Sequence, residues 1–94
     1  MDQIKVGEKT AVGIKIELPD SPPLLVIVGR KGFVMCGFLN MEAAERFSTV
    51  AAMVSGVKTF DDVLKAEVKA ATSKAKDFGV KIGMKGEKAL KLML

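Results

Sequence analysis

The chain has 94 residues, of which 49% are hydrophobic, with one cysteine, no histidine and a formal net charge of +4. One cysteine excludes an internal disulfide, and the lack of histidine excludes serine–histidine and cysteine–histidine catalytic pairs and histidine-containing zinc sites within the chain. The length predicts a single domain over residues 1–94, with enough apolar mass for one core.

Several features bear on location and partners. The apolar run Leu24–Val28 is far shorter than the roughly 20 residues that a membrane helix needs. Residues 1–12 are polar and do not resemble a secretion signal, so we expect a cytoplasmic protein without membrane contact. The lysines of the second half alternate with acids, as on a solvated helix face, and the chain has no Trp or Tyr to stack on bases. These features do not favour nucleic-acid binding.

The first forty residues follow strand patterns. Apolar and polar residues alternate from Val12 to Leu18, which predicts a half-buried strand after a shorter N-terminal one. The β-branched run Leu24–Val28 predicts a central strand covered on both faces, and residues 33–39 predict a fourth strand. Because the connections are short, the four strands should form an antiparallel meander.

After residue 39 apolar residues recur every three or four positions, which predicts helices. The first helix should begin after Asn40 as its N-cap and end at Gly56. Residues 60–78 form a second helical stretch, either one helix or two helices broken near residue 66. A third, short helix is expected from Gly86 to Met93.

Strands followed by helices predict an α+β fold. We expect a four-stranded, mainly antiparallel sheet with two or three helices packed on one face. The expected core includes Leu25, Ile27, Val34 and Phe47.

Three segments occur in an order that is similar to one known family. They are FVMCGFLN at residues 33–40, GVKTFDDVL at residues 56–64 and GVKIGMKGEKAL at residues 79–90. In these segments the chain resembles the YunC-like family of small bacterial and archaeal proteins, which have a domain of unknown function. The resemblance covers essentially the whole chain and implies a compact α+β domain with no assigned biochemical role.

The chain departs from the pattern of that family at two positions. Asn40 stands where an aspartate is common, and Lys85 stands where a small hydroxyl residue often caps the last helix. Either change would weaken a site that depended on that carboxylate or hydroxyl. The resemblance therefore supports the fold and leaves the function open.

Cys36 is the first candidate for a functional residue. Gly37 follows it and allows a ligand to approach closely, while the helix after Asn40 would present N–H groups to an anion unless Asn40 caps them itself. Without histidine, activation of the thiol needs a lysine, a helix N-terminus or a partner subunit. A free cysteine flanked by Met35 and Phe38 is more often a small buried core residue, which is the interpretation that we favour.

The glycine-rich segment 79–86 is the second candidate. Gly83 and Lys85 lie before the last helix and Gly86 lies at its start, where glycine backbone and a lysine can bind a small anion. The spacing matches neither the dinucleotide-binding motif nor the P-loop, and turn and capping roles are the alternative that we favour. Arg30 and Lys31 form a weaker candidate, because exposed cations at a hairpin tip usually only keep the sheet edge soluble.

The sequence contains no metal or cofactor motif, and we expect neither. The shortage of catalytic groups favours a protein that is not an enzyme. We predict a binding or assembly module that self-associates. The central strand is expected to be covered on both faces, but three short helices can hardly cover both faces of the sheet. A second copy of the chain, related by a two-fold axis, would cover the remaining face. The alternatives are a Cys36-dependent thiol enzyme or redox sensor, and a protein that binds a phosphate or carboxylate metabolite.

Overall fold

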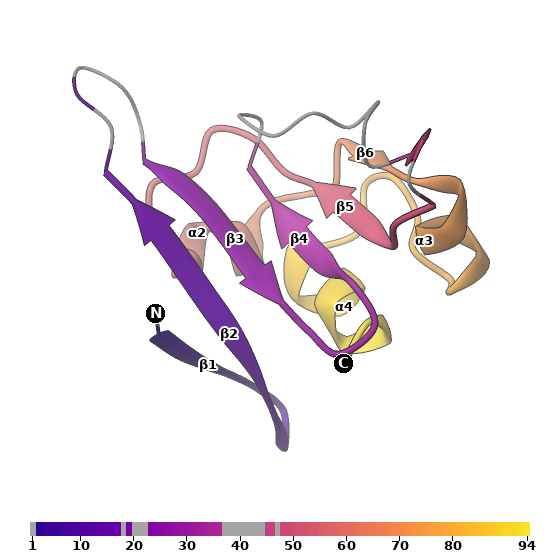
Figure 1. Ribbon diagram of the computed structural model, residues 1–94, viewed down its shortest axis with the longest axis horizontal. Helices are drawn as coiled ribbons and strands as arrows, with labels where there is room; N and C mark the ends of the chain where they lie inside the picture. Colours follow the sequence, from indigo (N-terminus) through magenta and orange to yellow (C-terminus); the bar gives the residue numbers. More distant parts are fainter. Residues whose placement is uncertain (1, 18, 20–22, 37–44, 47) are drawn as a thin grey trace.

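The structure is a computed structural model of residues 1–94, and it describes all of them except 1, 18, 20–22, 37–44 and 47. Among the described residues, six strands lie side by side in chain order and form one sheet (Figure 1). The strands are β1 (Asp2–Val6), β2 (Lys9–Ile16), β3 (Leu24–Val28), β4 (Phe33–Met35), β5 (Ala51–Met53) and β6 (Ala70–Ala71). Neighbouring strands are antiparallel except β4 and β5, which are parallel, so the sheet is mixed.

The first four strands form the antiparallel meander that the sequence predicts. Gly7 has a φ of 64° in the tight turn between β1 and β2, a left-handed conformation that glycine adopts without steric cost. The predicted core residues Leu25, Ile27 and Val34 have no exposed surface. Phe47, the fourth predicted core residue, lies outside the described residues.

The predicted helix over residues 40–56 is wrong in its second half. Ala51–Met53 is strand β5, in which Ala52 pairs with Val34 of β4. Residues 50–54 are all apolar, and all but the half-buried residue 53 are buried. Because a strand buried on both faces is apolar at every position, it also contains apolar residues at helical spacing. Burial thus produced a pattern that spacing alone assigned to a helix.

Three helices have described bounds: α2 (Phe60–Lys65), α3 (Ser73–Asp77) and α4 (Gly86–Leu92). The stretch 60–78 is therefore two helices, with β6 between them. The predicted four-stranded sheet is wrong because β5 and β6 come from segments that the sequence assigned to helices. The predicted third helix is confirmed as α4.

Thr72 joins α3 to the sheet. Its hydroxyl accepts hydrogen bonds from the N–H of Ala75 (3.2 Å), as the N-cap of α3, and of Ala51 (3.1 Å) in β5. The same hydroxyl donates to the carbonyl of Thr49 (2.6 Å). The side chain is 1% exposed, so these bonds satisfy a polar group that would otherwise destabilise the core.

Helices α2 and α4 pack against each other on one side of the sheet (Figure 1). Val63 of α2 and Leu90 of α4 belong to the same buried cluster as Leu25 and Ile27 of β3. The helices approach closely at Gly86, where an added Cβ would overlap the carbonyl oxygen of Val63. The core therefore lies between this helix pair and the central strands.

Candidate functional site

The sheet face opposite α2 and α4 carries an apolar surface. Side chains alternate along a strand, so Val26 and Val28 point away from the core that Leu25 and Ile27 enter. The register pairs Val26 with Ile14 of β2 and Val28 with both Val12 of β2 and Phe33 of β4. We name the open sheet face by its six residues: Val12, Ile14, Ile16, Val26, Val28 and Phe33.

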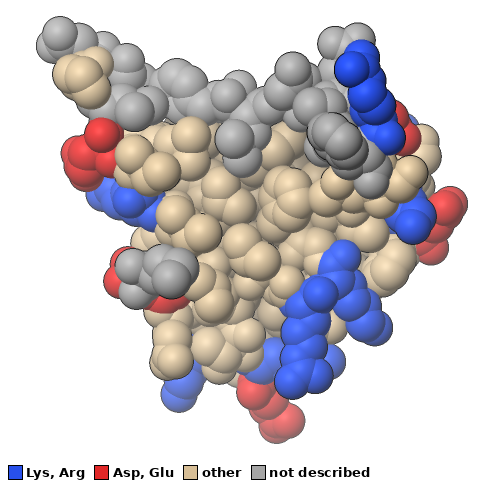
Figure 2. Space-filling model, viewed as in Figure 1, with Lys and Arg blue, Asp and Glu red and all other residues tan. Residues whose placement is uncertain are grey.

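The open sheet face is apolar and accessible. Val12 is 40% exposed and Ile16 is 50% exposed, while the other four residues are half-buried. Figure 2 shows it as part of a tan area at the centre of the view, with charged side chains towards the margins. Monomeric proteins rarely leave a contiguous apolar area of this kind in water. The surface therefore has the character of an interface.

The sequence predicts the alternation in β2 but not which of the two sets of side chains faces the core. The large residues of β2 point outwards, and the small residues Ala11 and Gly13 face the helices. A Cβ on Gly13 would lie 2.8 Å from Cε1 of Phe60 in α2, so the aromatic ring occupies the space that a larger residue would need. Without the position of Phe60, the larger side chains are the natural choice for the core face.

Cys36 lies inside the core. Its side chain is 4% exposed, its Sγ accepts a hydrogen bond from the N–H of Leu25 (3.3 Å), and its own N–H donates to the carbonyl of Leu25 (3.0 Å). This environment is that of a small apolar residue. The neighbouring candidates Gly37 and Asn40 lie outside the described residues.

The glycine-rich segment uses its N–H groups within the fold. Gly83 donates to the carbonyl of Val68 (2.8 Å), and Gly86 donates to the carbonyl of Ala66 (2.7 Å). Lys85 is the N-cap residue of α4, but its side chain makes no capping hydrogen bond. Because both glycine N–H groups already have partners, this geometry gives no support to an anion cradle here.

Glu45 makes a hydrogen bond at the start of α3. The N–H of Ser73 donates to Oε2 of Glu45 (2.9 Å). Hydrogen bonds from the side chain and backbone of Ser73 lower the pKa of Glu45, and the charge of Lys76 lowers it further. The carboxylate therefore stays ionised and links the segment before β5 to α3.

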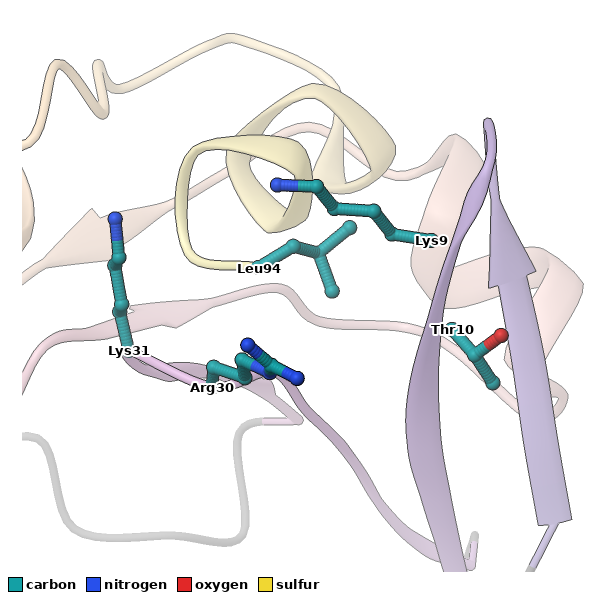
Figure 3. A pocket seen from close by; sticks show the side chains of 5 residues that line it. All are labelled: Lys9, Thr10, Arg30, Lys31 and Leu94. Atoms are coloured by element: carbon teal, nitrogen blue, oxygen red, sulfur yellow. The ribbon is translucent and has the colours of Figure 1, made fainter.

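A cavity of about 500 Å³ opens where β2 begins and where β3 turns into β4. Figure 3 shows its five lining residues: Lys9, Thr10, Arg30, Lys31 and Leu94. Three of them are cations, so we name it the cationic cavity. The sequence indicated Arg30 and Lys31 only as exposed cations at a hairpin tip. It did not show that Lys9 lies close to them, because the pairing of β2 with β3 brings these residues together.

Within the described part of the chain, no three Cys, Asp or Glu side chains are grouped so that they could hold a metal ion. No helix of the described residues combines the length and the hydrophobicity needed to cross a membrane.

Comparison with known proteins gives the family. The model of the family described as "Domain of unknown function (DUF1805)" matches residues 35–93. The chain belongs to this family. The uncharacterized protein YunC of Bacillus subtilis (strain 168) is 33% identical over an alignment of 95 positions, which covers 97% of this chain and 93% of YunC. The resemblance to the YunC-like family is thus confirmed.

A solved structure shares the fold of this DUF1805 chain. It is the crystal structure of a protein of unknown function from Thermoplasma acidophilum, with 38% identity and a TM-score of 0.93. The alignment covers 99% of this chain and 90% of that one. The fold of the family is therefore α+β with a mixed sheet, and these relatives are proteins of unknown function.

Proposed function

We propose that this DUF1805 protein is a cytoplasmic assembly module that forms a homodimer through the open sheet face. The observation that carries the proposal is the exposure of Val12 and Ile16, at 40% and 50%, within a group of six apolar residues on the open sheet face. Burying apolar surface contributes about 25 cal/mol per Å², so covering this face favours association.

A second copy of the chain is the occupant that this face fits best. Two-fold interfaces require a self-complementary surface, and the six apolar residues can meet their copies without unpaired charges, while Lys5 of the edge strand β1 lies at the margin of the same face. Two sheets commonly pack face to face at about 10 Å, with their strands about 30° apart.

The test compares a variant with a positive charge on the open sheet face with a variant that carries the same charge outside this face. Ile16→Lys puts an ammonium into the proposed interface twice, once from each copy. Ile82→Lys is the matched control, because Ile82 is 55% exposed and lies outside the open sheet face. An unpaired buried charge costs several kcal/mol, so the dimer dissociation constant of Ile16→Lys should rise at least about a hundredfold.

The measurement is the mass in solution by light scattering at micromolar concentration, with circular dichroism to verify folding. We expect a dimer for the wild type and for Ile82→Lys, and a folded monomer for Ile16→Lys and for Val12→Lys. A monomeric wild type contradicts the proposal. So does a dimer that survives both substitutions on β2, because the interface would then lie elsewhere.

A further inference from the structure

We propose that the cationic cavity binds a phosphorylated small molecule. It shares no residue with the open sheet face, so this proposal does not depend on dimer formation. Three cations converge on the cavity. Lys9 begins β2, while Arg30 and Lys31 lie in the turn after β3, and the pairing of Val12 with Val28 brings both segments to one end of the sheet. In Figure 3 the three cationic side chains surround the side chain of Leu94.

No Asp or Glu side chain of the described residues lines the cavity. The ion pairs among the described residues join Lys15 to Glu17, Lys65 to Asp61 and Lys91 to Glu87, and none of them involves a cavity residue. Three cations around one opening raise the local potential, and a bound anion relieves their mutual repulsion.

The turn that carries two of the cations is held in place. The N–H of Lys31 donates to the carbonyl of Met93 (2.8 Å), and the N–H of Gly29 donates to the carbonyl of Gly32 (2.8 Å). A Cβ on Gly29 would lie 2.6 Å from the carbonyl oxygen of Met93, so the turn is in close contact with the residues after α4. Arg30 and Lys31 therefore project from a turn that needs little ordering when a ligand binds.

The residues that line the cationic cavity favour phosphate over other anions. The guanidinium of Arg30 is a planar fork that can bind two phosphate oxygens at once, while Lys9 and Lys31 act as point charges. The hydroxyl of Thr10 is a further hydrogen-bond donor, and Leu94 provides an apolar wall for the body of a ligand. A volume of about 500 Å³ suits a small molecule, since ligand pockets commonly span about 300–1,000 Å³.

The test measures the affinity of three probes: inorganic phosphate, pyrophosphate and adenosine monophosphate. Titration followed by the amide NMR signals of Thr10 and Lys31 reports both the affinity and the location. We expect saturable binding of pyrophosphate that weakens as salt is added. Lys9→Gln and Arg30→Gln should each raise its dissociation constant about tenfold or more, since each removes one charged hydrogen-bond donor.

Lys74→Gln is the matched control, because it removes one positive charge from α3, away from the cavity lining. It should leave the affinity for pyrophosphate unchanged. Equal losses in all three variants would overturn the proposal, because the probe would then respond only to net charge. Absence of saturable binding at millimolar probe would also overturn it. So would binding of a single-stranded oligonucleotide without binding of the small probes, which would identify a nucleic-acid surface.

Discussion

At the scale of single residues, the thiol of Cys36 is buried and accepts a hydrogen bond from the neighbouring strand β3. The N–H of Leu25 donates to Sγ, and the side chain is 4% exposed. A reagent must reach the sulfur before a thiol can react, and burial keeps reagents away from Sγ of Cys36. The thiol-enzyme alternative therefore depends on whether Cys36 becomes accessible in the folded protein.

Thiol labelling at neutral pH tests this directly. We expect Cys36 in the folded protein to react with a disulfide reagent at least about a thousandfold more slowly than in urea, because labelling must wait for the small unfolded fraction. The control is the variant Cys36→Ala with Ser55→Cys, which moves the only thiol to an exposed position and should label quickly without urea. Rapid labelling of Cys36 in the folded wild type would favour a chemical role instead.

At the scale of elements, the contact between α2 and α4 depends on a missing side chain. Gly86 begins α4, and its N–H donates to the carbonyl of Ala66 at the end of α2 (2.7 Å). An added Cβ would overlap the carbonyl oxygen of Val63. Gly86→Ala should therefore lower the free energy of unfolding by about 2 kcal/mol or more, because backbone must move to make room.

Urea unfolding measures this loss. Gly56→Ala is the comparison, since a Cβ on Gly56 meets nothing within 4 Å and the cost comes only from its φ of 70°. That left-handed conformation costs about 1 kcal/mol for alanine. The expected order of stability is wild type, then Gly56→Ala, then Gly86→Ala. The close-contact account is wrong if Gly86→Ala is the more stable of the two variants.

Elements with a local signal could be predicted from the sequence. The meander has alternating or β-branched residues and short turns, and α4 has apolar positions at helical spacing. Strand β5 lies in an apolar run whose spacing also fits a helix, and β6 has no signal of its own. Ala70–Ala71 is too short for any period, and its position is fixed by pairing with β5 and by the hydroxyl of Thr72. These strands form because the existing sheet provides partners, which is information outside their own segments.

The candidate sites also differ in whether the sequence alone could predict them. The burial of Cys36 followed from its residue type and its apolar neighbours. The open sheet face required knowing that the ring of Phe60 takes the space beside Gly13. The cationic cavity required the register that places Lys9 near Arg30. Both surfaces arise from contacts between distant segments, so spacing along the chain does not show them.

At the scale of the whole molecule, the sheet has helices α2 and α4 on one side and the open sheet face on the other (Figure 1). Two copies joined through that face would form four layers, with helices outside and two sheets inside. The strand Leu24–Val28 would then be covered on both faces, as its composition predicts. In this arrangement the stability of the fold includes the interface, so it depends on protein concentration.

Thermal unfolding at several concentrations tests this dependence. For a dimer that unfolds to two chains, a tenfold rise in concentration adds about 1.4 kcal/mol per dimer, which should raise Tm by about 3–6 °C for a unit of this size. Ile82→Lys should keep that dependence. Ile16→Lys should lose it, because a monomer unfolds at the same temperature at any concentration. A wild-type Tm that stays constant over about a hundredfold range of concentration would show that the fold is stable without a partner. The open sheet face would then not be part of a dimer that contributes to stability.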